Sequence, residues 1–101
     1  MTIAEALDAQ AAELGGVERR TVGEVIEWDA GGVTFAALAG DAAEFRLGPA
    51  VAAAARGTPD TGPSGRGPDW VAFRPTELDR YARDRAMAWF GSAWRESKRP
   101  R

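Results

Sequence analysis

Residues 67–75, with the helical pattern that follows them, constrain the fold of this chain most. Within this stretch a short run rich in aromatic and β-branched residues, Asp69-Trp-Val-Ala-Phe-Arg74, lies between two prolines. Such a composition favours a strand, and the prolines mark its two ends. The longest helical pattern of the sequence then runs over residues 76–96. A strand that leads into a long helix is therefore the first expected unit of structure.

Apolar residues recur at helical spacing within residues 76–96. The expected buried stripe consists of Leu78, Ala82, Ala86, Trp89 and Ala93, flanked by Tyr81 and Phe90. Thr76 is the expected N-cap, with Asp79 at the capping-box position. Trp89 is the expected dominant core residue of this helix. Trp94 lies off the centre of the stripe, so it either covers an edge of the sheet or is exposed as an interaction residue.

The N-terminal segment predicts an amphipathic helix. Thr2 and Glu5 have the spacing of a capping box, and apolar residues recur from Ile3 to Leu14. Gly15-Gly16 supplies residues that can adopt a positive φ and so end the helix. We expect this helix to lie on a sheet.

The middle of the chain predicts strands joined by tight turns. The expected strands span residues 17–22, 24–28, 33–38 and 44–47. Such short connections suit antiparallel pairing, because parallel strands need a crossover of about a dozen residues. The first strand is polar, which suggests an edge of the sheet. Pro49 then opens a short helix that ends before Gly57.

These elements define an α+β fold. We predict a two-layer sandwich in which an antiparallel sheet of about five strands has the N- and C-terminal helices on one face, in the order α-β-β-β-β-α-β-α. One domain is expected over residues 1–96, with a flexible basic tail at residues 97–101. Residues 58–68 form a loop by composition, either an ordinary surface loop or a mobile segment that orders on binding.

The composition excludes several kinds of chemistry. The chain has no Cys and no His, which removes disulfides, thiol nucleophiles, zinc sites and the commonest general base. Catalysis would fall to carboxylates, Tyr81 or Lys98. The carboxylate pairs available, Asp29 with Glu27 or Asp41, lie at turns, where solvation explains them. We therefore expect no enzyme activity, no cofactor and no metal. The N-terminus lacks a signal peptide and no apolar run spans a bilayer, so a cytoplasmic protein is expected.

The net charge of −2 is distributed unevenly. Residues 1–73 carry a net charge of −6, whereas residues 74–101 carry +4. A basic segment on an acidic body is either a solvated helix face or a surface for an anionic partner. The candidate binding residues are Arg66, Arg74, Arg83, Trp94, Arg95, Lys98 and Arg99.

Four short motifs follow one another along most of the chain. They are Gly15-Gly-Val-Glu18, a Gly31-Gly-Val-Thr-Phe-Ala36 strand after Trp28-Asp29, a Trp70-Val-Ala-Phe73 strand after Thr58-Pro59, and a helix end Ser92-Ala-Trp-Arg95 near Lys98-Arg99-Pro100. Together these motifs resemble the MmcQ/YjbR-like family of small bacterial proteins. The resemblance implies a CyaY-type two-layer sandwich, and members of the family are described as DNA-binding proteins with a double-wing motif. A rival resemblance, to small luciferase-associated domains, fits less of the N-terminal half.

Three functions remain open at this point. The first is a non-catalytic module that binds a protein partner or itself, through the free sheet face, a sheet edge or Trp94. The second is DNA binding by the basic helix and tail, with Arg80 beside the candidate residues; the acidic body disfavours it. The third, implied by frataxin-type relatives of the fold, is weak iron binding by Glu5, Asp8 and Glu13 on the first helix.

Overall fold

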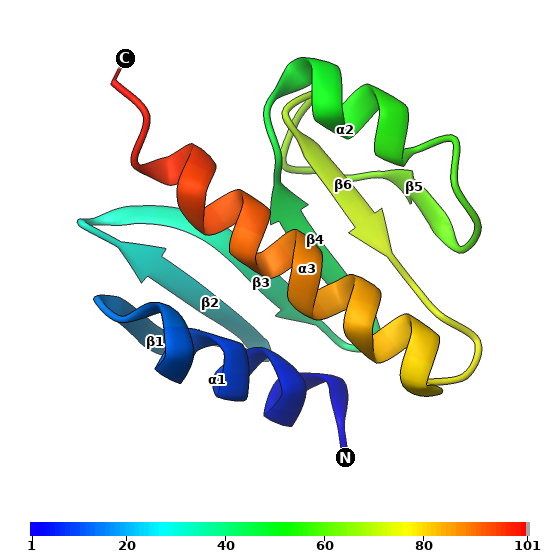
Figure 1. The fold of residues 1–101 in the computed structure, drawn as a ribbon, viewed down its shortest axis with the longest axis horizontal. Coiled ribbons are helices and arrows are strands. Elements are labelled where there is room, and N and C mark those ends of the chain that lie inside the picture. Colours follow the sequence, from blue (N-terminus) through cyan, green and yellow to red (C-terminus); the bar gives the residue numbers. More distant parts are fainter. Residues whose placement is uncertain (101) are drawn as a thin grey trace.

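The structure is a computed structural model, and it describes residues 1–100. Its elements follow the chain in the order shown in Figure 1. They are α1 (Ile3–Leu14), β1 (Val17–Val22), β2 (Val25–Ala30), β3 (Val33–Ala39), β4 (Ala42–Arg46), α2 (Pro49–Ala55), β5 (Thr61–Pro63), β6 (Trp70–Phe73) and α3 (Arg80–Ser97).

Within residues 1–100 the strands form one six-stranded antiparallel sheet in the order β1-β2-β3-β4-β6-β5. Helices α1 and α3 lie together on one face of it, so the predicted α+β sandwich and its order of elements are confirmed (Figure 1). The polar strand β1 forms one edge, as its sequence suggested. Helix α2 packs beside β6.

The sheet has one strand more than the sequence indicated. Strand β5 lies inside residues 58–68, which their composition predicted to be a loop. Three residues are too few to show an alternating pattern, but they pair with β6 from Thr61 opposite Phe73 to Pro63 opposite Val71. This pairing orders the first half of the predicted loop.

The predicted caps of α1 are confirmed. The Thr2 side chain accepts a hydrogen bond from the Glu5 backbone N–H, and the Glu5 carboxylate accepts one from the Thr2 backbone N–H. This backbone donor is the main reason why the pKa of Glu5 is lowered. Gly15 ends the helix with φ 80°.

Helix α3 begins three residues later than the expected N-cap indicated. Its N-cap is Asp79 in place of Thr76, and the Asp79 carboxylate accepts a 2.8 Å hydrogen bond from the Ala82 N–H. The helix ends at Ser97, which the sequence placed in the tail, and Lys98 is its C-cap. Arg101, the last residue of that predicted tail, lies outside the described residues.

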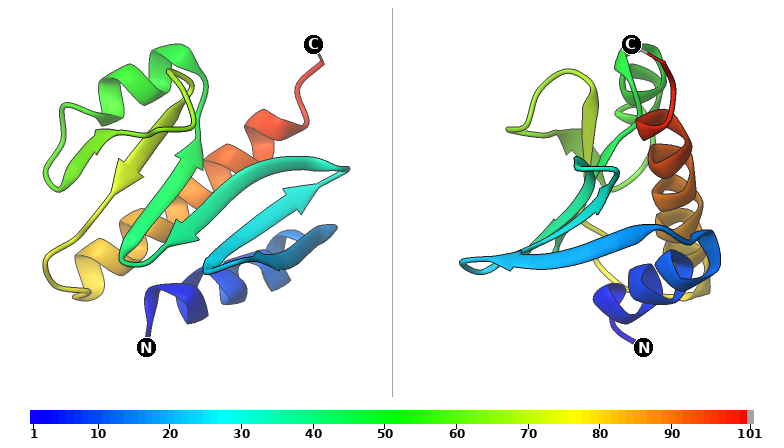
Figure 2. Two further views of the ribbon diagram at one scale, coloured as in Figure 1. Left: turned by 180° about the vertical axis from the view of Figure 1, so that it is seen from behind. Right: turned by 90° about the vertical axis from the view of Figure 1, so that its left-hand side faces the viewer.

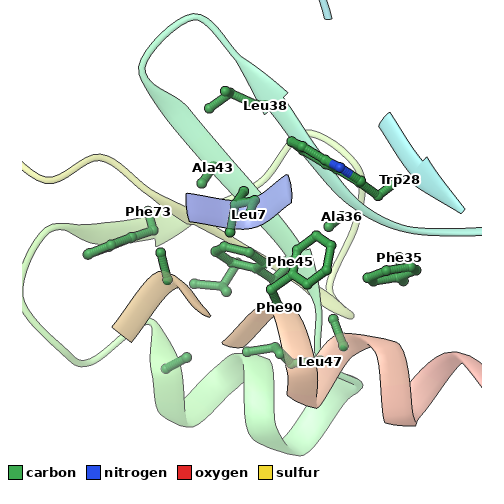
Figure 3. Close-up of a cluster of buried hydrophobic side chains, with 14 of the residues drawn as sticks. Leu7, Trp28, Phe35, Ala36, Leu38, Ala43, Phe45, Leu47, Phe73 and Phe90 are labelled. Carbon is green, nitrogen blue, oxygen red and sulfur yellow. The ribbon is translucent and has the colours of Figure 1, made fainter. Parts of the chain in front are cut away.

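The buried face of α3 is rotated from the predicted stripe. Phe90, expected at the flank, is fully buried, whereas Trp89 is only partly buried and Tyr81 is exposed. Phe90 meets Trp28 and Phe35 edge-on, with ring centroids 5.6 and 5.0 Å apart. Figure 3 shows this centre of the core. The rotation follows from α1, which packs along α3 and so extends the buried face toward Phe90.

Candidate functional site

The face of the sheet opposite α1 and α3 carries a network of charged side chains. Glu27 on β2 and Glu44 on β4 both lie opposite Ala37 on β3, so their side chains share one row of the sheet. Trp28, the next residue after Glu27, contacts Phe90 on the helix-covered face. Because neighbouring side chains on a strand point to opposite faces, the two glutamates lie on the open face.

Arg66 lies between these two glutamates. Its Nη2 is 2.7 Å from Glu27 Oε2, and its Nε is 3.5 Å from Glu44 Oε1. Its guanidinium also lies over the Trp70 ring, 5.2 Å from the centroid. The Ser64 hydroxyl donates a hydrogen bond to Glu44. We refer to Arg66, Glu27, Glu44, Ser64 and Trp70 as the Arg66 cluster.

The Arg66 cluster closes the middle of the open face. The Glu27 and Glu44 side chains are only 13% and 14% exposed, and Ala37 beneath them is fully buried. The segment between β5 and β6 lies on the side opposite α1 and α3 (Figure 2, right). The open face, which the sequence suggested as a free surface for a partner, is therefore occupied at its centre by a loop of the same chain.

Carboxylates on the same face are also held by Arg20 of β1. Its Nη2 is 2.8 Å from Glu27 Oε1 and its Nε is 3.0 Å from Asp29 Oδ2. The Thr34 hydroxyl donates to Asp29 and accepts from Arg20. Glu27 and Asp29, the carboxylates considered for catalysis, are thus both bound to arginine, and the third, Asp41, is exposed in the turn between β3 and β4.

Two of the acidic residues considered for iron binding also have other partners within the fold. Glu5 is part of the α1 capping box, and Asp8 Oδ1 accepts a hydrogen bond from Trp28 Nε1 at 3.1 Å. Arg19 Nε lies 3.3 Å from the same Asp8 oxygen. Among residues 1–100, no three or more acidic side chains come together in a way that would hold a metal ion. Glu5 and Asp8 are thus both engaged in contacts within the fold.

The seven candidate binding residues do not form one site. Arg66 lies on the open face of the sheet, whereas Arg83, Trp94 and Arg95 belong to α3, on the other face. Arg74 follows β6 and is exposed.

The end of α3 has contacts of its own. Trp94 packs against the core, and Lys98 Nζ lies 4.6 Å from its ring centroid, so the ring is not a free stacking surface. Trp94 Nε1 is buried without a hydrogen-bond partner among the described residues. Arg99 pairs with Glu96 at 3.2 Å. Arg46, Glu96, Arg99 and Pro100 line a hollow of about 280 Å³, which holds both signs of charge.

A second cluster on α3 was not anticipated from the sequence. The Arg85 guanidinium lies 5.3 Å from the centroid of the Tyr81 ring and 5.0 Å from that of Trp89. It also approaches the Phe73 ring at 5.8 Å, and its Nη1 donates a 3.1 Å hydrogen bond to the Pro59 carbonyl. Tyr81 is 69% exposed. We refer to Tyr81, Arg85 and Trp89 as the Arg85 surface.

The spacing of the Arg85 surface was visible in the sequence. Residues 81, 85 and 89 are four apart, which places them along one side of a helix. An aromatic residue on either side of an arginine at this spacing is a signal for cation–π contacts. The helical pattern instead placed Trp89 in the buried stripe and Tyr81 at its flank.

Comparisons with known proteins find no relative of this chain. No protein-family model matches the chain, no curated protein matches it, and no solved structure matches it. Among residues 1–100, no helix has the length and apolar character needed to cross a lipid bilayer.

Proposed function

We propose that this chain is a non-catalytic interaction module that binds a protein partner through the Arg85 surface. The observation that carries the proposal is the exposed Tyr81 ring, held in place by Arg85. Tyr, Trp and Arg are the residues most enriched among those that dominate binding energy at protein interfaces. Here all three lie side by side on one helix.

The contacts of Arg85 prepare this surface for binding. Three aromatic rings and the Pro59 carbonyl restrict the Arg85 side chain before any partner arrives. Association then costs less side-chain entropy than it would for a freely rotating arginine. The guanidinium keeps further N–H donors beyond the one used by Pro59. The fitting partner is therefore a protein segment that offers a carboxylate beside an apolar side chain.

The proposal assigns no catalytic group. It is supported by the absence of Cys and His from the sequence and by the arginine partners of Glu27 and Asp29. Membership of the MmcQ/YjbR-like family is part of the same proposal. This membership is supported by the sequence motifs and by the order of helices and strands. It does not by itself assign a function, because one fold can host many functions.

Photo-crosslinking tests this surface directly. With p-benzoylphenylalanine in place of Tyr81, we expect a defined crosslinked protein in an extract of the native host. The same probe at Asp41, which is exposed in the turn between β3 and β4 and does not belong to α3, should give none. With the purified partner, Tyr81→Ala should weaken binding roughly tenfold, a change of about 1.4 kcal/mol measured by calorimetry. Arg95→Ala, on a later turn of α3, should leave the affinity unchanged. Equal affinity for Tyr81→Ala and the unchanged chain would contradict the proposal.

DNA binding is the second candidate. One observation favours it: Arg95 lies in the last turn of α3, Lys98 is the C-cap, and Arg99 follows the cap directly. Against it, Arg99 is paired with Glu96, and Arg80 lies 3.9 Å from Asp84. The mixture of charges weakens the field that phosphate binding needs.

A labelled duplex separates the two candidates. We expect fluorescence anisotropy to show no salt-sensitive binding, even at low ionic strength. Binding that falls steeply with salt, and that falls further when Arg83, Arg95, Lys98 and Arg99 are replaced by Ala, would move the assignment to DNA binding.

A further inference from the structure

The two edges of the sheet differ in their capacity to accept another strand. Strand β5 has three residues and ends at Pro63, which has no N–H to donate. Strand β1 has six residues, contains no proline and pairs on one side only, with β2. In the right-hand view of Figure 2, β1 runs across the near side of the molecule and α1 lies to one side of it.

We propose that a second copy of this chain pairs with β1 in antiparallel orientation, with Arg19 on the two-fold axis. The resulting dimer has one continuous sheet through both copies. The surface involved is distinct from the Arg85 surface, because α3 lies over β3 and β4 while β1 forms the edge (Figure 1).

The hairpin between β1 and β2 determines which backbone groups of β1 are free. Val22 lies opposite Val25, so the loop contains only Gly23 and Glu24. Residues that flank a two-residue hairpin loop form a hydrogen-bonded pair, and such pairs alternate along the ladder. Residues 18, 20 and 22 therefore bond to β2. The N–H and C=O groups of residues 17, 19 and 21 point outward.

In one register, the outward backbone groups of one copy lie opposite the outward backbone groups of the second copy. An antiparallel copy centred on Arg19 places Arg19 opposite Arg19 of the second copy, and Val17 opposite Thr21. Each of these pairs joins two residues whose backbone groups point outward, so the whole free edge from residue 17 to residue 21 is bonded. The same register keeps the helix-covered faces of both copies on one side, because residues of like parity lie opposite each other.

Charge selects this register among its neighbours. It places Glu18 of each copy opposite Arg20 of the other. A shift of the partner by two residues in one direction brings Glu18 opposite Glu18, and a shift in the other direction brings Arg20 opposite Arg20. Like charges directly opposite are destabilising, and opposite charges are stabilising. Charged residues that usually protect an edge strand from pairing here favour a single alignment.

Both partners of the new ion pair are available. Glu18 is exposed and forms no ion pair within residues 1–100. The Arg20 side chain is 52% exposed, and its contacts with Glu27, Asp29 and Thr34 use only Nε and Nη2. Nη1 of Arg20 remains for a carboxylate of the second copy. The two Arg19 residues repel each other at the axis. In each copy, Arg19 Nε lies 3.3 Å from Asp8 Oδ1, and this negative charge offsets part of the repulsion.

Sedimentation equilibrium over a series from micromolar to millimolar concentration tests the dimer and its register. We expect a reversible dimer whose dissociation constant rises at least tenfold in Glu18→Arg, because two attractive pairs become repulsive. Glu24→Arg makes the same change of charge in the hairpin loop and should leave the dimer unchanged. Arg19→Thr should tighten it, since it removes the like-charge pair at the axis. Tyr81→Ala should have no effect.

The backbone and the axis can be tested separately. Arg19→Pro removes an outward N–H without touching the bonds to β2, so the fold should remain by circular dichroism while the dimer is lost. The chain has no Cys, so Arg19→Cys can form a disulfide only between copies. A hydrogen-bonded antiparallel pair has its Cα atoms about 5.5 Å apart, within the range that a disulfide spans. Oxidation should crosslink Arg19→Cys rapidly and Glu24→Cys slowly. A chain that is monomeric at every concentration, or a dimer that is insensitive to Glu18→Arg and Arg19→Pro, would overturn the proposal.

Discussion

Replacing Phe90 by Ala is expected to lower the free energy of unfolding by about 3–5 kcal/mol, the range measured for removal of a buried aromatic ring. Phe90 is fully buried and joins α3 to Trp28 of β2 and Phe35 of β3 through edge-to-face ring contacts. The substitution therefore removes contacts to two strands at once and leaves a cavity beneath the helix. Urea denaturation followed by tryptophan fluorescence measures the loss.

Tyr81→Ala is the matched control for this change, because it removes another aromatic ring from α3 at a position that is 69% exposed. It should cost less than about 1 kcal/mol. Should Phe90→Ala leave too little folded protein, Phe90→Leu keeps most of the volume and should show a smaller loss in the same direction. A Phe90 variant as stable as the Tyr81 variant would contradict the observed rotation of α3.

Arg66→Ala is expected to lower the free energy of unfolding by about 2–3 kcal/mol, because it leaves two nearly buried carboxylates without one of their partners. Glu27 retains Arg20, and Glu44 retains Ser64, so the loss should fall short of that for a fully buried pair. Thermal and urea unfolding of the variant measure the effect. Proteolysis between β5 and β6 should also become faster, since the segment loses its contact with the sheet.

An exposed ion pair provides the control for Arg66. Arg80→Ala breaks the ion pair between Arg80 and Asp84, in which both side chains are largely exposed. It should change the free energy of unfolding by no more than about 0.5 kcal/mol. Arg66→Lys should have an intermediate effect, because an ammonium group keeps the charge but loses the planar fork that reaches both glutamates. A double-mutant cycle with Glu27→Gln isolates the pairwise energy. A coupling energy near zero would show that the Arg66 cluster does not hold the loop.

Local signals in the sequence predicted the elements that depend on local chemistry. Thr2 with Glu5 predicted the start of α1, and Gly15 its end, because caps involve residues within one turn of each other. The span of β1, residues 17–22, was predicted to the residue. Asp79 was placed in the first turn of α3 but as the third residue of a capping box, because Thr76, three residues earlier, offered an equally good cap.

Features that depend on contacts between distant segments were not predicted. Arg66 is the only cation within residues 58–68, but its partners Glu27 and Glu44 share a row only through the register of β2, β3 and β4. The sequence of residues 58–68 carries no information about the register of those three strands, so the partners of Arg66 could not be predicted from it. Phe90 was placed at the flank of α3 because helical periodicity alone does not say from which side α1 packs.

The Arg66 cluster also bears on the order in which this chain reaches its final structure. The contact between Arg66 and Glu27 joins residues 39 apart in sequence, across a pairing of strands that must already exist. Closing so long a loop costs chain entropy before the ion pair can offset that cost. We therefore expect the contact between Arg66 and Glu27 to form late in folding. Interactions absent from the transition state slow unfolding without changing the rate of folding. The pair of glutamates on the open face therefore governs the lifetime of the native state more than the speed with which it forms.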